Sequence, residues 1–96
     1  MSEVLVKFYS DVRGVVGLSS VPIKMNDGEI VKNLIDELCH KFPDSFSKII
    51  YEPNTNKLNS SILIFVNKIP IAMLEGENTI LENGDEITFF AAVSGG

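Results

Sequence analysis

The sequence has little of the chemistry that most enzymes use. Its 96 residues include one cysteine, one histidine and no tryptophan. A single cysteine excludes an intrachain disulfide, and one cysteine with one histidine cannot build a tetrahedral zinc site unaided. The chain also lacks a P-loop and a dinucleotide-binding glycine pattern. We therefore expect that it is not an enzyme by itself and that it binds no metal or cofactor.

Basic residues and long apolar runs are scarce too. Eight Lys and Arg face 13 Asp and Glu, which gives a net charge of −5. Nucleic-acid binding depends on clustered Lys and Arg, so the balance disfavours it and favours a partner with a basic docking surface. No apolar run approaches the roughly 20 residues of a membrane span, and the first residues lack a signal-peptide pattern. We expect a cytoplasmic protein with no membrane partner.

The length and the apolar fraction of 45% predict one domain. We place it at residues 1–92, followed by a flexible Gly-Gly tail at 93–96. Alternating apolar residues predict strands at 4–9 and 20–25, joined by a glycine-punctuated connection at 11–17. The continuous apolar run at 62–66 predicts a central strand buried on both faces, at least at one end. A short strand at 69–73 and a last strand at 86–93 follow.

One segment has the apolar spacing of a helix. Apolar residues recur every three or four positions from Val31 to Phe42, and Pro43 ends the pattern. We expect this helix at about 29–42, with Cys39 on its apolar stripe and His40 on its polar side. A short ordered turn near 46–51 and an exposed loop at 52–56 come next. The prediction is an α+β domain: a mixed sheet of four or five strands, crossed by one main helix, as in the ubiquitin-like β-grasp.

The last four residues, Val93-Ser94-Gly95-Gly96, suggest chemistry carried out by a partner. Two glycines make a slim segment that can pass through a narrow channel. A terminal carboxylate is a poor electrophile until it is adenylated, and glycine puts no side chain beside the carbonyl that is attacked. We expect Gly96, next to Gly95, to be the reacting residue and Val93 and Ser94 to enter the partner. A frayed terminus without function is the alternative.

Acidic residues collect just before the last strand. Five of them lie between positions 75 and 86 with no Lys or Arg among them: Glu75, Glu77, Glu82, Asp85 and Glu86. A solvated loop face is one interpretation. The other is a docking patch beside the tail, in which Glu82, Asp85 and Glu86 bind a basic partner.

Residues 81–96, LENGDEITFFAAVSGG, resemble the end of the small subunit of molybdopterin synthase (MoaD), of the MoaD/ThiS-type ubiquitin-like sulfur carriers. That family combines an acidic turn, an aromatic strand and a Gly-Gly tail. Residues 6–17 are similar to its first strand and loop, and residues 65–68 to its Val-Asn-Gly turn, with Lys68 in place of Gly. The chain departs at Ala91-Ala92, where the family commonly has a proline pair.

The resemblance implies a β-grasp fold and a role as sulfur carrier. A ubiquitin-activating-type enzyme would adenylate Gly96 with MgATP, and a sulfur donor would convert the adenylate to a thiocarboxylate. The tail would then enter the large subunit of molybdopterin synthase and deliver sulfur to a precursor pterin in molybdenum or tungsten cofactor synthesis. The resemblance also places Tyr9, Leu74 and Phe90 in an apolar docking patch.

Three other functions stay open on the sequence. A lysine amine could attack the same activated Gly96, which would make the chain a ubiquitin-like protein modifier. The chain could carry sulfur for thiamine synthesis or for tRNA thiolation, although thiamine carriers tend to be shorter. It could also be an interaction domain with an inert tail.

Overall fold

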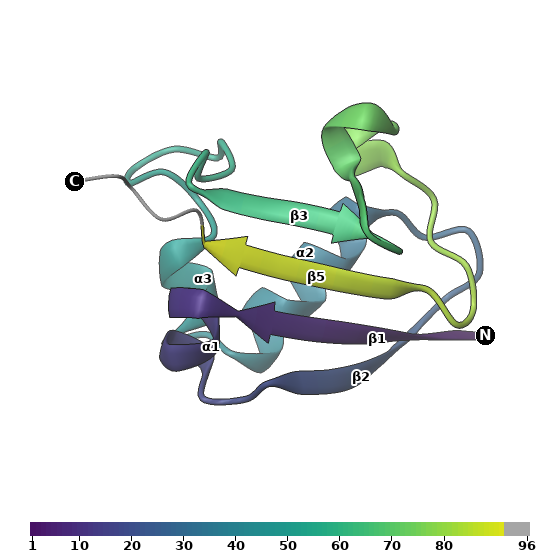
Figure 1. Ribbon diagram of the computed structural model, residues 1–96, viewed down its shortest axis with the longest axis horizontal. Coiled ribbons are helices and arrows are strands. Elements are labelled where there is room, and N and C mark those ends of the chain that lie inside the picture. Colours follow the sequence, from purple (N-terminus) through teal and green to yellow (C-terminus); the bar gives the residue numbers. More distant parts are fainter. Residues whose placement is uncertain (92–96) are drawn as a thin grey trace.

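The computed structural model describes residues 1–91, which form one sheet with helices packed against it (Figure 1). The strands are β1 (Ser2–Tyr9), β2 (Ser20–Met25), β3 (Ile62–Val66), β4 (Ile69–Pro70) and β5 (Glu86–Ala91). The helices are α1 (Ser10–Val16), α2 (Val31–Lys41) and α3 (Phe46–Ile49), with 3-10 turns at η1 (Ile71–Met73) and η2 (Gly76–Asn78).

The sheet is mixed, with five strands in the order β2-β1-β5-β3-β4. The first and last long strands, β1 and β5, lie parallel at its centre, while β1 with β2 and β3 with β5 are antiparallel. Alternation along β1 puts Val4, Val6 and Phe8 in the core and Leu5 and Tyr9 on the opposite, exposed face. The expected α+β architecture with a mixed sheet is confirmed.

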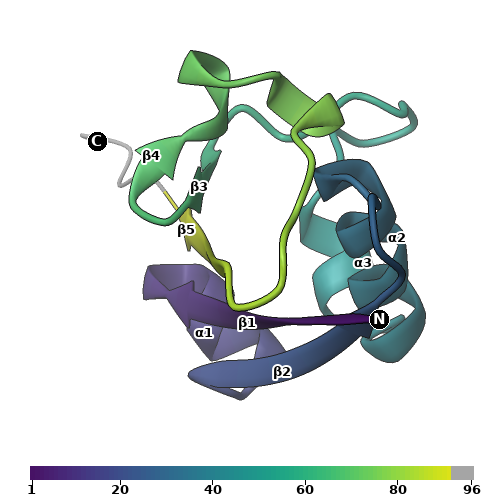
Figure 2. The ribbon, with the colours of Figure 1, turned by 90° about the vertical axis from the view of Figure 1, so that its right-hand side faces the viewer.

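Helix α2 crosses one face of this sheet, as the spacing predicts. Its four core residues, Val31, Leu34, Ile35 and Leu38, are fully buried. The Asn33 Oδ1 accepts the N–H of Ile30 at 2.9 Å and so satisfies a backbone donor at the helix start. Figure 2 shows α2 and α3 together on one side of the sheet, and residues 1–91 leave the other side uncovered.

The segment at 11–17 is not the predicted loop. It forms helix α1, with Val12 fully buried beneath it and Gly17 ending it at φ 87°. A segment of seven residues is too short to show a clear apolar period, and Gly14 within this segment suggested a turn. Burial of Val12 against the core stabilises the helix in spite of that glycine, a tertiary effect that local propensity does not contain.

Two predictions for the β3–β4 region are wrong in part. The fourth strand covers only Ile69–Pro70, and the chain then turns into η1, because proline has no N–H to continue a ladder. Strand β3 is buried on the helix side only, and its Leu63 is 42% exposed. No described element covers the other face of the sheet at this point, so apolar residues on both sides of β3 do not mean burial on both sides.

Short segments elsewhere follow the prediction. The ordered turn near 46–51 is α3, and residues 53–57 form an exposed loop. His40 is exposed, and Cys39 is half-buried against the core. Over residues 1–91, no helix is both long and apolar enough to cross a membrane. The domain boundary at 92 stays a prediction, since residues 92–96 lie outside the described part of the chain.

Candidate functional site

The uncovered face of the sheet carries a row of apolar side chains at the end of β5. Phe90 is the register partner of Tyr9 on β1 and of Leu63 on β3. Register partners point to the same side of a sheet with their side chains about 5 Å apart, so these three residues form one row, here called the apolar row. Tyr9 is 43% exposed and Leu63 42%. Exposed aromatic and aliphatic side chains in contact are typical of a protein-binding surface.

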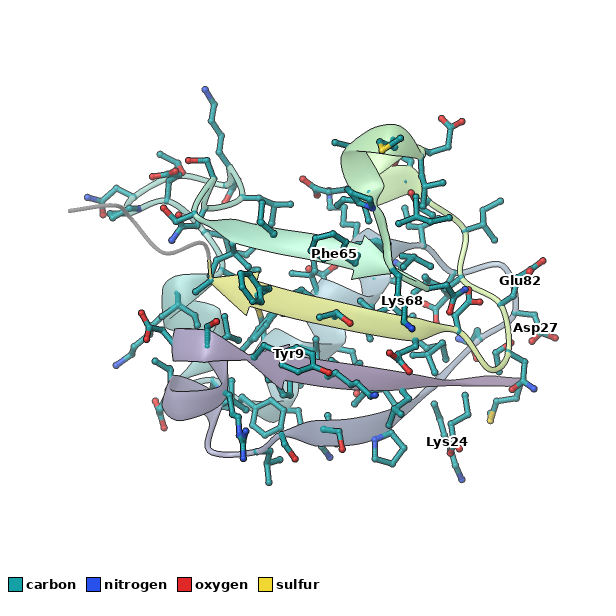
Figure 3. The ribbon with its side chains drawn as sticks, in the orientation of Figure 1. Tyr9, Lys24, Asp27, Phe65, Lys68 and Glu82 are labelled. Atoms are coloured by element: carbon teal, nitrogen blue, oxygen red, sulfur yellow. The ribbon has the colours of Figure 1, made fainter. Side chains whose placement is uncertain are left out.

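A second, more polar row of side chains lies beside the apolar row on the same face of the sheet. Thr88 lies between Lys7 on β1 and Phe65 on β3. The Nζ of Lys7 is 3.5 Å from a carboxylate oxygen of Glu86. Figure 3 shows Tyr9 and Phe65 on the same face, directed away from α2. A partner on this face would therefore meet apolar contacts near Ala91 and a charged pair further along β5.

An aromatic cluster lies beneath the apolar row. Phe8 and Phe89, the neighbours of Tyr9 and Phe90, are register partners on the core side with ring centroids 6.1 Å apart. Phe46 of α3 meets the Phe89 ring edge-on at 5.1 Å. Such aromatic pairs contribute about 0.5–1.5 kcal/mol each beyond their buried area. The cluster holds the ends of β1 and β5 together and so fixes the spacing of the apolar row.

The acidic turn is held by its own hydrogen bonds. One oxygen of Asp85 accepts the Glu82 N–H at 2.8 Å, and the other accepts the Asn67 Nδ2 at 2.8 Å. The Asn67 Oδ1 in turn accepts the Glu86 N–H at 2.9 Å. Asp85 therefore joins the turn before β5 to the β3–β4 hairpin. Glu82 is exposed and Glu86 pairs with Lys7, so Glu82 is the most accessible of these three acids.

The acidic turn and the last described residue lie at opposite ends of β5. The turn lies at the start of β5, whereas Ala91 lies at the strand's end (Figure 1). Five residue steps in a strand separate the two by about 16 Å. The sequence predicted a docking patch beside the tail, and the tail residues, 93–96, lie outside the described part of the chain. Whether Glu82, Asp85 and Glu86 contact a partner stays a prediction.

Leu74 does not join the apolar row either. It follows η1 and is 38% exposed. It therefore comes from beyond β4, at the edge of the sheet, while Tyr9 is on β1 with β5 and β3 between them. Strand spacing puts that edge about 14 Å from β1. A partner touching both Leu74 and Tyr9 would have to span most of the uncovered face.

The predicted reacting residues lie outside the part of the chain that the structure describes. Val93, Ser94, Gly95 and Gly96 belong to residues 92–96. Among residues 1–91, no three His, Cys, Asp or Glu side chains come together as metal ligands. Burial, with a smaller effect of the nearby Asp36 carboxylate, raises the pKa of the Cys39 thiol above its ordinary value. A raised pKa makes a thiol a weaker nucleophile at neutral pH.

Two residues of the uncovered face were missed by the sequence reasoning. Leu63 and Phe65 were assigned to a strand buried on both sides, yet they line this face beside Phe90 and Thr88. The signal was present, because β3 is apolar at every position, whereas β1 carries the polar residues Glu3 and Lys7 on the face opposite the core. An all-apolar strand in a sheet with one main helix indicates either a second covering layer or an exposed apolar surface.

Comparison with known proteins supports the ubiquitin-like β-grasp fold. The sequence pattern of the ThiS family matches residues 6–96. The small archaeal modifier protein 1 of Methanosarcina acetivorans is 34% identical, with a TM-score of 0.84 over 100% of this chain and 98% of that one. A chain of the Amycolatopsis orientalis BexX/CysO complex is 26% identical, with a TM-score of 0.73 over 97% and 99%.

A third similar structure is the candidate subunit 1 of molybdopterin converting factor from Pyrococcus furiosus. It is 22% identical, with a TM-score of 0.77 over 97% of this chain and 100% of that one, and at this identity it bears on the fold alone. A comparison with curated proteins finds no match. The ubiquitin-like β-grasp expected from the sequence is confirmed. The chain therefore belongs to the ThiS family of ubiquitin-like sulfur carrier proteins.

Proposed function

We propose that this chain carries sulfur as a thiocarboxylate on Gly96 and delivers it within molybdopterin synthase. In the first step the Gly96 carboxylate attacks the α-phosphate of ATP, which releases pyrophosphate and leaves an acyl adenylate. In the second, sulfide supplied by a sulfur donor attacks the acyl carbon and AMP leaves. The product is a C-terminal –COS⁻ group. The activating enzyme supplies MgATP and the catalytic groups, so this chain acts as carrier rather than catalyst.

One observation carries the proposal: the apolar row lies at the end of β5, directly before the segment that contains Gly95-Gly96. Tyr9, Phe90 and Leu63 offer a docking surface about one residue from the start of that segment. Five residues, 92–96, extend at most about 18 Å. A partner docked on the apolar row would therefore have its reactive centre within reach of Gly96 without unfolding the domain.

One finding supports molybdopterin synthase as the client: residues 81–96 resemble the end of its small subunit. In this role the sulfur passes to a precursor pterin, and the free Gly96 carboxylate returns for another cycle. The large subunit would contact the uncovered face, with Tyr9, Phe90 and Leu74 among the apolar contacts.

A second candidate function is protein modification. The 34% identical structure from Methanosarcina acetivorans is that of a modifier protein. Here a lysine amine of a target attacks the activated Gly96, and an isopeptide bond forms as the leaving group departs. The activation step is common to both functions, so the acceptor separates them.

Intact mass spectrometry tests the activation step. The purified chain is incubated with MgATP, a cognate activating enzyme and a sulfide source. We expect a mass increase equal to one oxygen replaced by sulfur, dependent on ATP and mapped to Gly96. A variant lacking Gly95 and Gly96 is the matched control and should gain nothing. No increase in the full chain, with an activating enzyme shown to be active on another carrier, would contradict the proposal.

Two further measurements separate the acceptors. Thiocarboxylated chain mixed with a large subunit and precursor pterin should form the dithiolene product and return to its starting mass. A blot for tagged chain in a lysate of cells should show no higher-mass conjugates if sulfur transfer is its role. Abundant conjugates that disappear on deletion of Gly95-Gly96, with no dithiolene formed, would favour the modifier.

A further inference from the structure

We propose that a cavity on the helix side of Ala91 receives a lysine or arginine side chain from the enzyme that activates Gly96. This inference rests on the proposed function, because it names a contact of the activating partner. The cavity has a volume of about 280 Å³ and lies where β5 ends. It is separate from the apolar row, which lies on the other face of the sheet.

The cavity has an apolar interior and an acidic rim. Its apolar lining comes from four elements that meet at this end of the domain: Val12 and Val15 of α1, Ile49 of α3, Ile62 of β3 and Ala91 of β5. Its polar lining is Asp11, Asn59 and Ser61. Val12 is fully buried, so it forms the floor, while Asp11 is exposed and lies at the mouth.

The polar groups differ in what they can offer a ligand. The Asn59 Nδ2 donates to the Ile49 carbonyl at 3.1 Å, and its Oδ1 accepts the Ser61 N–H at 2.9 Å. Asn59 is thus occupied in holding the wall of the cavity. Among residues 1–91 the Asp11 carboxylate is in neither of the two ion pairs and in no side-chain hydrogen bond. Asp11 is therefore the charged group that the cavity presents to a partner.

This combination selects a long cationic side chain. Lysine and arginine have an apolar stem that can lie against Val15 and Ile62 and a charged head that stays near the surface. A purely apolar side chain would remove water from the Asp11 carboxylate without replacing it, which is unfavourable. The net charge of −5 also favours a basic partner surface.

The position of the cavity connects it with activation. Side chains alternate along β5, so Phe90 faces the apolar row and Ala91 faces the helix side. A partner that takes up the chain after Ala91 therefore meets one contact surface on each face of the sheet. Ala91 contributes only a methyl group to the lining, so a larger side chain at this position would fill the cavity.

A titration with a small probe tests the cavity without any partner. We expect n-butylguanidinium to cause saturable amide shifts in the ¹⁵N-labelled chain at Val12, Ser61 and Ala91. The neutral isostere n-butylurea should cause less than half the shift. Asp11→Asn and Ala91→Leu should each abolish saturation, whereas Asp36→Asn on the outer side of α2 should not. Equal responses to both probes, or an unchanged response in Asp11→Asn, would overturn the proposal.

Adenylation kinetics test the identity of the occupant. Asp11→Asn should raise the KM for the carrier about fivefold with kcat within about twofold, as expected for a partly exposed interfacial charge, and Asp11→Glu should restore most of it. Binding of the probe with an unchanged KM in both Asp11→Asn and Ala91→Leu would rule out the activating enzyme as source of the side chain. Failure of the wild-type chain to be adenylated would instead contradict the proposed function, and the probe titration would still decide whether the cavity binds a cation.

Discussion

Replacing Lys68 with glycine should make the protein more stable. Lys68 is the second residue of the two-residue loop between β3 and β4, and its φ is 71°. Asn67 before it has φ 50°. Two positive φ angles are what a type I′ hairpin requires. Asparagine tolerates this region, whereas lysine does not favour it, so the turn holds one residue in an unfavourable conformation.

The magnitude follows from two opposing effects. The left-handed conformation costs a residue with a Cβ about 1–2 kcal/mol. Glycine removes that cost but loses more backbone entropy on folding, by roughly 0.4–1 kcal/mol. Lys68 is exposed and is in neither ion pair of the described residues, so its side chain contributes little that would be lost. The net expectation is a gain of about 0.5–1 kcal/mol in the free energy of unfolding, or about 2–6 °C in Tm for a domain of this size.

Urea unfolding of Lys68→Gly and Lys68→Ala measures the effect. The alanine variant is the matched control, because it removes the side chain and keeps the Cβ that causes the strain. We expect Lys68→Ala to stay within about 0.5 kcal/mol of the wild type, as surface substitutions do. The m-values should not change. A Lys68→Gly variant no more stable than Lys68→Ala would refute the reasoning from backbone strain.

Three further predictions concern the site and its support. Phe90→Ala should weaken binding of the activating enzyme or the large subunit by more than about 1 kcal/mol, as for buried aromatic anchors; calorimetry with an unchanged Kd would remove it from the interface. Asn67→Ala should lower the free energy of unfolding by about 1–3 kcal/mol. The variant loses two hydrogen bonds of about 0.5–1.5 kcal/mol each, one of them to Asp85, and also the preference of asparagine for this turn. A loss below 0.5 kcal/mol in urea unfolding would show that water replaces these hydrogen bonds. The Cys39 thiol should react with iodoacetamide at pH 8 more slowly than glutathione does, since its raised pKa lowers the thiolate fraction and burial limits access; an Asp36→Asn variant should react somewhat faster, and a wild-type rate equal to that of glutathione would contradict the assignment.

The strongest sequence predictions were those based on long periodic patterns. The α2 stripe and the alternation in β1 each repeat over several positions, and each reports one buried face. The predicted orientation of Tyr9, opposite Val4 and Phe8, is confirmed for the same reason. The predictions for α1 and β4 failed, because these two segments are too brief for a period to appear and depend on contacts from distant parts of the chain.

The residues of the candidate site were likewise predictable only in part. Sequence resemblance pointed to Tyr9 and Phe90, and the sheet register shows that they are neighbours. It did not point to Leu63, because a contact between β3 and β5 joins residues 27 positions apart. Nor could it show that Asp85 is engaged by Asn67 or that Asp11 lines a cavity with Ala91.

The sequence by itself determined the α+β composition, the main helix, the inward face of β1 and β2 and the Gly-Gly segment on which the proposed function rests. These follow from local periodicity and from the chemistry of single residue types. The tertiary structure alone decided that the apolar row and the acidic turn lie at opposite ends of β5, and that an acid-rimmed cavity borders Ala91. Those are relations between segments distant in sequence, and they arise only when burial of a shared core brings the strands and helices into one register.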